Sequence, residues 1–222
     1  SCLYIVEDLL PRFGVASTLI DGTDLDQWRA AMRPNTKVCF LESPTNPQLE
    51  VLDIAAIADI DEANDKPIPT ATINVLGNMH ALEAARIAGA RRFVFASTVY
   101  VYSESGSFYR ASKQAAERFT ETYFDRYGLE YNILRYGSLY GRRSDRRNGI
   151  YRMLREAVEQ HSITYKGSGE AMREYIHVED AARMSVQVLA PEFANRHLIL
   201  TGQEKLRIRD VMTMISEMMP WP

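Results

Sequence analysis

The chain has 222 residues, of which 46% are hydrophobic and 25% are charged, and its formal net charge is −3. This composition is typical of a globular protein whose core is large enough for one large domain or two small ones. The small negative charge provides no basic field for nucleic acid or an anionic membrane, so we expect neither partner. No apolar run in the sequence approaches the ~20 residues that a bilayer-spanning helix needs.

Patterns typical of helices and strands alternate along the chain, without an internal repeat. Apolar residues at helical spacing, N-terminal caps and closing glycines predict helices over residues 3–13, 23–32, 53–63, 70–90, 108–128, 148–160 and 207–219. Short apolar runs predict strands over residues 16–20, 37–42, 92–98, 131–137 and 197–202, and residues 175–190 are expected to form a short strand that runs into a helix. Strands separated by such helices imply βαβ units, and therefore an α/β sheet with right-handed crossovers.

Three further features of the sequence bear on this pattern. Prolines exclude helix from SPTNPQLE (43–50), and KPIP (66–69) is expected to break the chain before the long helix that follows. The methionines of VMTMISEMM (211–219) fall at helical spacing and are expected in the core. The two cysteines, Cys2 and Cys39, are too few for a disulfide framework or a metal cage. We therefore predict no metal site and a reducing, cytoplasmic location.

The stretch SFYRASKQAAERF (107–119) places Tyr109 four residues before Lys113, on one face of the expected helix. A free tyrosine has a pKa of about 10, and a neighbouring ammonium favours the phenolate, so that the tyrosine can act as a base near neutral pH. The preceding strand ends in Ser97 and Thr98, and ligands of open α/β sheets bind at the carboxyl ends of strands. Since YxxxK also occurs by chance on surface helices, the prediction depends on this context.

Further stretches accompany this one in a fixed order. They are INVLGNMHALEAARIAGARRFVFASTVYVYS (73–103), YRASKQAAERF (109–119), YNILRYGSLYGRR (131–143), REYIHVEDAAR (173–183) and LTGQEKLRIRDVMTMISEM (200–218). With them, the chain from about residue 60 onward resembles the carboxy-terminal part of an extended short-chain dehydrogenase/reductase of the NAD-dependent nucleotide-sugar epimerase/dehydratase kind. The resemblance implies a doubly wound, mostly parallel, Rossmann-like sheet with flanking helices and a small C-terminal α/β part.

The resemblance also implies roles for residues around the YxxxK motif. Tyr109 would be the general acid/base, and Lys113 would lower its pKa and hold the nicotinamide ribose of NAD. Thr98 would be the active-site hydroxyl, with Ser97 beside it on the cofactor side. Asn74 matches a helix asparagine that lies near the family's active site and cofactor.

On the substrate side, Arg173 matches an arginine that contacts the diphosphate of a nucleotide sugar. Ser138 stands where many relatives carry asparagine, after RYG, and is the second residue expected at the substrate. Without the resemblance, a surface ion pair of Arg173 with Glu174 or Glu179 is the simpler interpretation. His177, a lone histidine in a short strand, is expected to be a packed structural residue.

Two departures from the family pattern affect the expected function. The loop between Thr98 and Tyr109 is short for the family, so the substrate pocket is expected to differ from the family's. The GxxGxxG turn, on which the family binds the NAD pyrophosphate at its first strand, does not occur in the 222 residues. We therefore expect cofactor binding, and with it catalysis, to be impaired.

Residues 1–60 show a different resemblance, carried most specifically by FLESPTNPQLEVLDI (40–54). They are similar to an internal piece of a pyridoxal-phosphate-dependent trans-sulfuration enzyme of the O-succinylhomoserine sulfhydrylase type, in which the position of Asn46 lies near the cofactor ring. A Pro-bracketed loop is the simpler interpretation of this motif. The pattern ends before that family's pyridine-binding aspartate and Schiff-base lysine, and Lys66 and Lys113 lie in matches to the other family. Pyridoxal-phosphate catalysis is therefore not expected.

We accordingly divide the chain into residues 1–60 and residues 61–222. A join between pieces of two enzymes could be an engineered chimera, an error of sequence assembly or a natural fusion, and we favour the first two. A start at Ser1 without Met and an end on MPWP also indicate a fragment.

Three hypotheses of function follow. The first is an impaired NAD-dependent epimerase/dehydratase acting on a nucleotide-sugar-like small molecule. The alternative is a catalytically inactive chimeric α/β scaffold, and a fragment of a pyridoxal-phosphate enzyme is a third, weaker hypothesis. Both resembled families imply a homo-oligomer.

Overall fold

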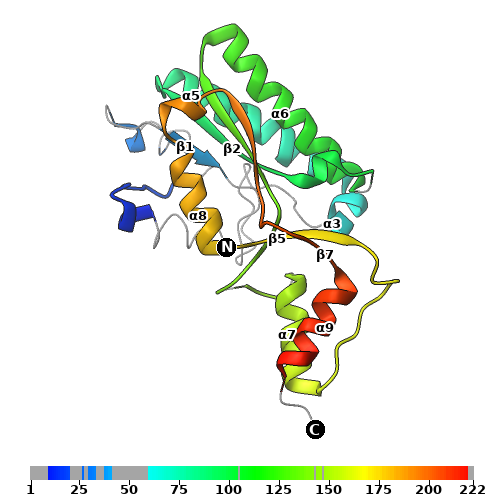
Figure 1. Ribbon diagram of the computed structural model, residues 1–222. Helices are drawn as coiled ribbons and strands as arrows, with labels where there is room; N and C mark the ends of the chain where they lie inside the picture. Colours follow the sequence, from blue (N-terminus) through cyan, green and yellow to red (C-terminus); the bar gives the residue numbers. More distant parts are fainter. Residues whose placement is uncertain are drawn as a thin grey trace.

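A parallel sheet of four strands, in the order β1-β2-β3-β6, forms the centre of the molecule (Figure 1). The strands are β1 (Val38–Leu41), β2 (Arg92–Thr98), β3 (Glu130–Tyr136) and β6 (Arg196–Leu200). This computed structural model describes residues 10–20, 27, 30–33, 38–41, 60–104, 106–142, 144–146 and 148–219. Its architecture confirms the predicted α/β class and the mostly parallel sheet.

Helices connect these strands and cover the sheet. After the 3-10 turn Leu10–Phe13, the helical elements are α3 (Ile60–Asp65), α4 (Pro67–Ala71), a π-helical segment (Thr72–Leu76), α5 (Gly77–Ile87), the 3-10 turn η4 (Val99–Tyr102), α6 (Ser107–Tyr127), α7 (Gly149–Gln160), α8 (Val178–Gln187), the 3-10 turn Pro191–Phe193 and α9 (Ile208–Met218). In Figure 1, α5 and α6 lie along one side of the sheet and α8 lies on the other. The sheet is therefore doubly wound.

The core consists of two layers because β2 alternates its side chains between the two faces. Phe93 and Phe95 pack with Leu82 of α5 and Ala116 of α6. On the opposite face, Val94 and Ala96 pack against α8 and β6. All seven residues of β2 are buried, which explains why the strand reads as a near-continuous apolar run.

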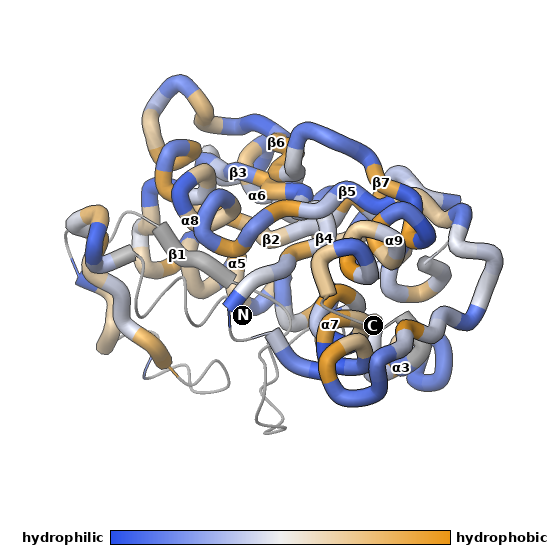
Figure 2. The backbone as a smooth tube through the Cα atoms, turned by 60° about the horizontal axis from the view of Figure 1, so that its bottom comes forward, coloured by the Kyte–Doolittle hydropathy of each residue, from blue (hydrophilic) through white to orange (hydrophobic). Residues whose placement is uncertain are grey.

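A second, smaller sheet in the order β4-β5-β7 belongs to the C-terminal part. It consists of β4 (Ser138–Tyr140), β5 (Met172–His177) and β7 (Lys205–Arg207), with β4 parallel and β7 antiparallel to β5. Beside it, α7 and α9 pack together, and Figure 2 shows their tubes changing between hydrophilic and hydrophobic, as amphipathic helices do. This confirms the predicted small C-terminal α/β part.

The predicted strand at residues 16–20 is wrong. These residues have no regular structure and are mostly exposed, with Leu19 at 53% exposure. A short apolar run becomes a strand only where a neighbouring strand accepts its hydrogen bonds, and among the described residues none pairs with it. The predicted strand at residues 37–42 does form, as β1.

The break expected at residues 66–69 is confined to Lys66. Helix α4 starts directly afterwards. Its prolines, Pro67 and Pro69, are tolerated because they lie in the first turn, where a missing N–H costs no intrahelical bond. Of the helix predicted at residues 23–32, residues 27, 30 and 31 are helical. The parts of the N-terminal predictions that fall within residues 3–9, 21–26 and 42–59 lie outside the described residues.

The methionines of α9 are only partly in the core. Met212 packs with the buried cluster of Ile208, Val211 and Ile215, whereas Met214 and Met218 are 47% and 68% exposed. The last two are four residues apart and lie at the edge of the buried face, beside the cluster. The prediction that all the methionines of this segment are core residues is therefore wrong.

Arg92 joins the amino end of β2 to the end of α8. Its buried guanidinium donates hydrogen bonds to the carbonyl groups of residues 188–190, to Asn132 and to Glu130. These carbonyl groups follow the end of α8, and that of residue 190 also accepts the Phe193 N–H at 3.1 Å, so the arginine is the partner chiefly of residues 188 and 189.

We expect Arg92→Met to lower the free energy of unfolding by about 3 kcal/mol, because it strands several buried acceptors. Arg91→Met is the matched control, since Arg91 contacts the same Glu130 at 3.6 Å from a side chain that is 60% exposed. Its effect should stay below about 0.5 kcal/mol. Urea denaturation measures both values, and equal effects would contradict the role given to Arg92.

Candidate active site

The candidate site lies where β2 ends and α6 begins. Strand β2 ends at Thr98, the turn η4 follows, and Gly106 leads into α6 with φ of 102°. A side chain at Gly106 would be strained at this φ, and its Cβ would come within 3.2 Å of the Arg110 Cβ. The glycine therefore permits the short loop that brings α6 back onto the strand end.

Tyr109 and Lys113 lie side by side on the buried face of α6. The Nζ of Lys113 is 6.0 Å from the centre of the Tyr109 ring and 5.0 Å from that of Phe95. It donates a 3.0 Å hydrogen bond to the Ala96 carbonyl, and Lys113 is only 2% exposed. The lysine is thus fixed between the strand and the tyrosine.

Glu117 continues this helical face and was missed in the sequence. Its carboxylate accepts a hydrogen bond from Ser97 Oγ at 2.5 Å and is bound at both oxygens by Arg135, at 3.0 and 2.6 Å. This bidentate bonding raises the pKa of Arg135 above its usual value. Its position four residues after Lys113 is a signal that could have found Glu117.

Asn74 reaches the site through Ser112. Its Nδ2 donates to Ser112 Oγ at 2.8 Å, and Ser112 Oγ in turn donates to the Tyr109 carbonyl at 2.8 Å. Asn74 is buried in the π-helical segment, a distortion that is frequent at functional sites. The asparagine therefore fixes the α6 backbone at Tyr109.

Tyr100 contacts three of the predicted site residues and was also missed. Its backbone N–H donates to Thr98 Oγ1 at 3.2 Å, and its ring meets the Tyr109 ring edge-on, at 6.4 Å between centres. The Arg173 guanidinium lies 5.6 Å above the centre of the same ring. The YVY pattern after Thr98 gave no signal for the contact with Arg173, because the two residues are far apart in the sequence.

Arg173 and Ser138 approach from the second sheet. Ser138 lies two residues beyond Tyr136, which pairs with Thr98, so β3 brings it to the same edge as the strand end. Among the described residues Arg173 forms no ion pair with Glu174, whose carboxylate binds Lys205 Nζ at 2.6 Å. The simpler ion-pair interpretation of Arg173 is therefore wrong for Glu174.

His177 has the structural role expected of it. Its Nδ1 accepts a 3.3 Å hydrogen bond from the Glu179 N–H at the start of α8, and its ring packs edge-on against Tyr140. It thereby caps the helix.

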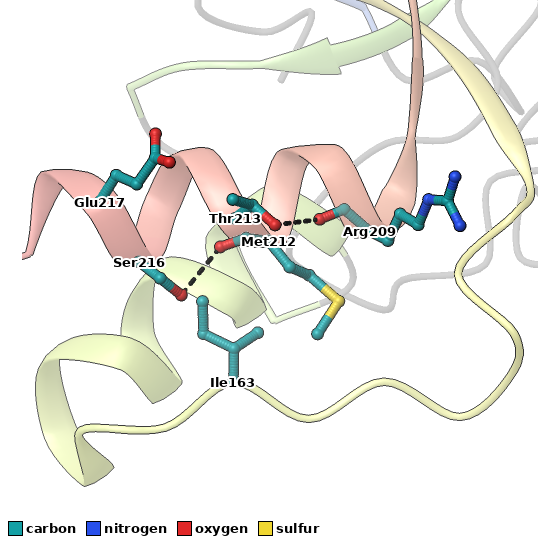
Figure 3. A pocket seen from close by; sticks show the side chains of 6 residues that line it. All are labelled: Ile163, Arg209, Met212, Thr213, Ser216 and Glu217. Atoms are coloured by element: carbon teal, nitrogen blue, oxygen red, sulfur yellow. Dashed lines mark hydrogen bonds between the residues drawn. The ribbon is translucent and has the colours of Figure 1, made fainter.

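Tyr109 lines neither of two hollows on the described part of the chain. One of about 540 Å³ lies along α9 (Figure 3) and is lined by Ile163, Arg209, Met212, Thr213, Ser216 and Glu217. The other, of about 380 Å³, borders the Glu117–Arg135 pair. In the first, the Thr213 and Ser216 hydroxyls donate to carbonyls of their own helix.

The part of the chain that the structure describes contains no cluster of three or more histidine, cysteine or acidic side chains placed to hold a metal ion. Nor does any helix in those residues combine the length and apolar character needed to cross a membrane.

A doubly wound parallel sheet with a buried tyrosine–lysine pair at a strand end defines a Rossmann-like α/β protein. A sequence model of the NAD dependent epimerase/dehydratase family matches residues 44–199, more than half of the chain. The chain belongs to this family. A model of the Cys/Met metabolism PLP-dependent enzymes matches residues 1–76, so both matches cover residues 44–76.

Individual relatives divide in the same way. A UDP-glucuronate 4-epimerase of Thermodesulfobacterium geofontis is 28% identical over 154 residues, which cover 64% of this chain and 48% of the relative. An O-succinylhomoserine sulfhydrylase of Mycobacterium tuberculosis is 40% identical over 63 residues, which cover 28% of this chain and 16% of the relative. The chain thus spans about half the length of the curated epimerase relatives it matches.

Solved structures share the fold. The dTDP-glucose 4,6-dehydratase DesIV from Streptomyces venezuelae, solved with NAD, has a TM-score of 0.75 and 23% identity, covering 94% of this chain and 66% of its own. The UDP-glucose 4-epimerase of Thermus thermophilus, solved with NAD, has a TM-score of 0.72 and 24% identity, covering 96% of this chain and 78% of its own. These likenesses confirm the Rossmann-like fold.

We expect Glu117→Gln to lower the free energy of unfolding by about 2–3 kcal/mol, because it leaves the mostly buried Arg135 without its carboxylate. Glu83→Gln is the matched control, since Glu83 also binds an arginine through two hydrogen bonds, but at an exposed position. Urea denaturation should show a far smaller change for the control, and an equal change would contradict the importance of the buried pair.

Proposed function

We propose that this chain carries the proton-transfer half of a nucleotide-sugar epimerase/dehydratase site, with Tyr109 as the general acid/base. One observation carries the proposal. The buried Lys113 ammonium lies 6.0 Å from the Tyr109 ring at the carboxyl end of β2, where ligands of this fold class bind. An ammonium at this distance favours the phenolate form of the tyrosine.

In the proposed reaction, the phenolate oxygen of Tyr109 takes the proton from a sugar hydroxyl. Thr98 Oγ1 accepts from the Tyr100 N–H, which leaves its O–H available to donate to the substrate oxygen. NAD, when bound, supplies the hydride acceptor for the carbon of that hydroxyl. The Lys113 charge keeps the tyrosine able to take up and return the proton.

The nicotinamide end of NAD fits the described residues better than its pyrophosphate end. Lys113 would hold the nicotinamide ribose, with Ser97 and Asn74 fixing the strand and helix around it. A pyrophosphate needs closely approaching backbone N–H groups, and the sequence has no GxxGxxG turn to supply them. We therefore propose that these 222 residues, by themselves, bind NAD weakly and convert their substrate slowly.

For the substrate, we propose a nucleoside diphosphate sugar whose diphosphate binds Arg173 and whose sugar approaches Ser138. A guanidinium suits a diphosphate because its planar N–H groups bond two oxygens at once. The UDP-glucuronate 4-epimerase relative supports a UDP-sugar over other nucleotides. A homo-oligomer and a cytoplasmic location remain proposals, supported by the resembled families and by the low cysteine content.

The second candidate is a catalytically inactive scaffold in which residues 1–60 and 61–222 derive from two enzymes. The matches of two different family models, to residues 1–76 and 44–199, support a derivation from two enzymes. The pyridoxal-phosphate hypothesis is the weakest, and incubation with that cofactor followed by borohydride reduction should leave no covalently bound chromophore.

We expect NAD to bind the purified chain at millimolar concentration, and Tyr109→Phe to reduce any turnover of UDP-glucuronate by about a hundredfold or more. Tyr127→Phe, at an exposed position of the same helix, is the matched control and should leave turnover unchanged. Isothermal titration measures the binding, and chromatographic separation of UDP-glucuronate from its 4-epimer measures the turnover.

The outcomes separate the two candidates. No binding of NAD at millimolar concentration would rule out the epimerase/dehydratase function of this chain. Turnover that disappears in Tyr109→Phe would rule out the inactive scaffold, and micromolar NAD binding would contradict the proposed impairment.

A further inference from the structure

Tyr100 lies between the two parts of the candidate site. Thr98 and Tyr109 belong to the four-stranded sheet and its helix α6, whereas Arg173 belongs to β5 of the second sheet. Tyr100 contacts all three, through its backbone N–H, an edge-on contact of the two tyrosine rings, and its ring face. We propose that Tyr100 is a positioning residue that sets the distance between the Arg173 guanidinium and the Tyr109 phenol. This inference rests on the proposed function.

The backbone of Tyr100 is held firmly enough for this role. Its N–H bonds Thr98 Oγ1, and its carbonyl accepts a 2.9 Å hydrogen bond from the Ser103 N–H, so the turn η4 is closed at both ends. The Tyr100 ring also lies close to Gly106: a Cβ added to this glycine would be 3.7 Å from Tyr100 Cδ1. The ring is therefore confined between the strand end and the start of α6.

The face of the Tyr100 ring can orient the Arg173 guanidinium so that it binds an anion such as a diphosphate. The negative face of an aromatic ring attracts a guanidinium, and stacking uses the flat side of the ion while its N–H edge still points outward in the plane. Arg173 Nη1 donates one bond to the Met172 carbonyl, which fixes the rotation of the plane. The neighbouring carboxylate of Glu174 is bound by Lys205 and so does not compete for the guanidinium.

The same ring also contacts the phenol that moves the proton. The Tyr100 and Tyr109 rings meet at 73°, an edge-on arrangement that aromatic pairs favour. A diphosphate bound by Arg173 would consequently place its sugar at a distance from Tyr109 that depends on the Tyr100 ring. The ligand class that this arrangement selects is a nucleoside diphosphate whose attached group extends toward Tyr109.

The test compares Tyr100→Phe, which keeps the ring, with Tyr100→Leu, which removes it. UDP is the probe, and its affinity is measured by NMR titration. We expect Tyr100→Phe to bind UDP within about twofold of the unmodified chain, and Tyr100→Leu to bind it about three- to tenfold more weakly. Adding Tyr100→Leu to Arg173→Met should weaken binding no further, because the ring acts through the arginine.

Tyr102→Leu is the matched control. Tyr102 lies in the same turn, but its ring lies under Arg135, at 4.8 Å. It should leave UDP affinity unchanged. A second readout needs no ligand. It is the NMR resonance of the Arg173 side-chain Nε–H, which is assigned by its loss in Arg173→Met. The ring current of Tyr100 should shift this resonance in the unmodified chain and in Tyr100→Phe, and the shift should disappear in Tyr100→Leu.

Three results would overturn the proposal: unchanged UDP affinity in Tyr100→Leu, equal weakening with and without Arg173, or an Arg173 resonance that does not respond to Tyr100→Leu. If the unmodified chain binds no UDP, the proposed substrate class fails, and the Arg173 resonance then decides alone whether Tyr100 positions the guanidinium.

Discussion

The hydrogen bond from Lys113 Nζ to the Ala96 carbonyl is the contact on which the rest of the site depends. An ammonium that is almost fully buried is costly unless polar groups surround it, so α6 cannot slide along β2 without breaking this bond. One helical turn later, Glu117 binds Ser97, the next residue of the strand. The two contacts fix the register of helix on strand, and Tyr109 and Thr98 take their places from it.

Charge on the outer side of this helix–strand contact is balanced by a connected network. Arg135 of β3 binds Glu117, and the same guanidinium bonds His197 of β6, whose other ring nitrogen lies 2.8 Å from Glu121. Replacing a buried ion pair by apolar side chains is often neutral for stability, so its contribution is better understood as specificity. These bonds join α6 to both β3 and β6, so a shift of the helix over the sheet would break them.

Local patterns predicted the elements that carry the site, and failed where pairing is decided at a distance. Strand 92–98 and helix 107–127 follow from a buried apolar run and from helical periodicity, and these two elements alone place the tyrosine beside the lysine. The strands 138–140 and 205–207 are too short to show a period, and they form because β5 lies between them. The run 16–20 has strand composition without a partner among the described strands. Contacts through Tyr100 cross between two sheets and have no local signature.

Strand β1 illustrates how differently a sheet and a cofactor site depend on sequence. The strand lies outside the residues matched by the epimerase/dehydratase model and inside those matched by the Cys/Met metabolism model, yet it pairs in parallel with β2 from Val38 to Leu41. A β-ladder is made by backbone groups that every residue except proline possesses, so an edge strand from another enzyme can be accepted. A pyrophosphate cradle, by contrast, requires glycines at particular positions, because only they allow the backbone to approach the phosphates. The sheet can therefore accept a substituted strand more readily than the cofactor site can.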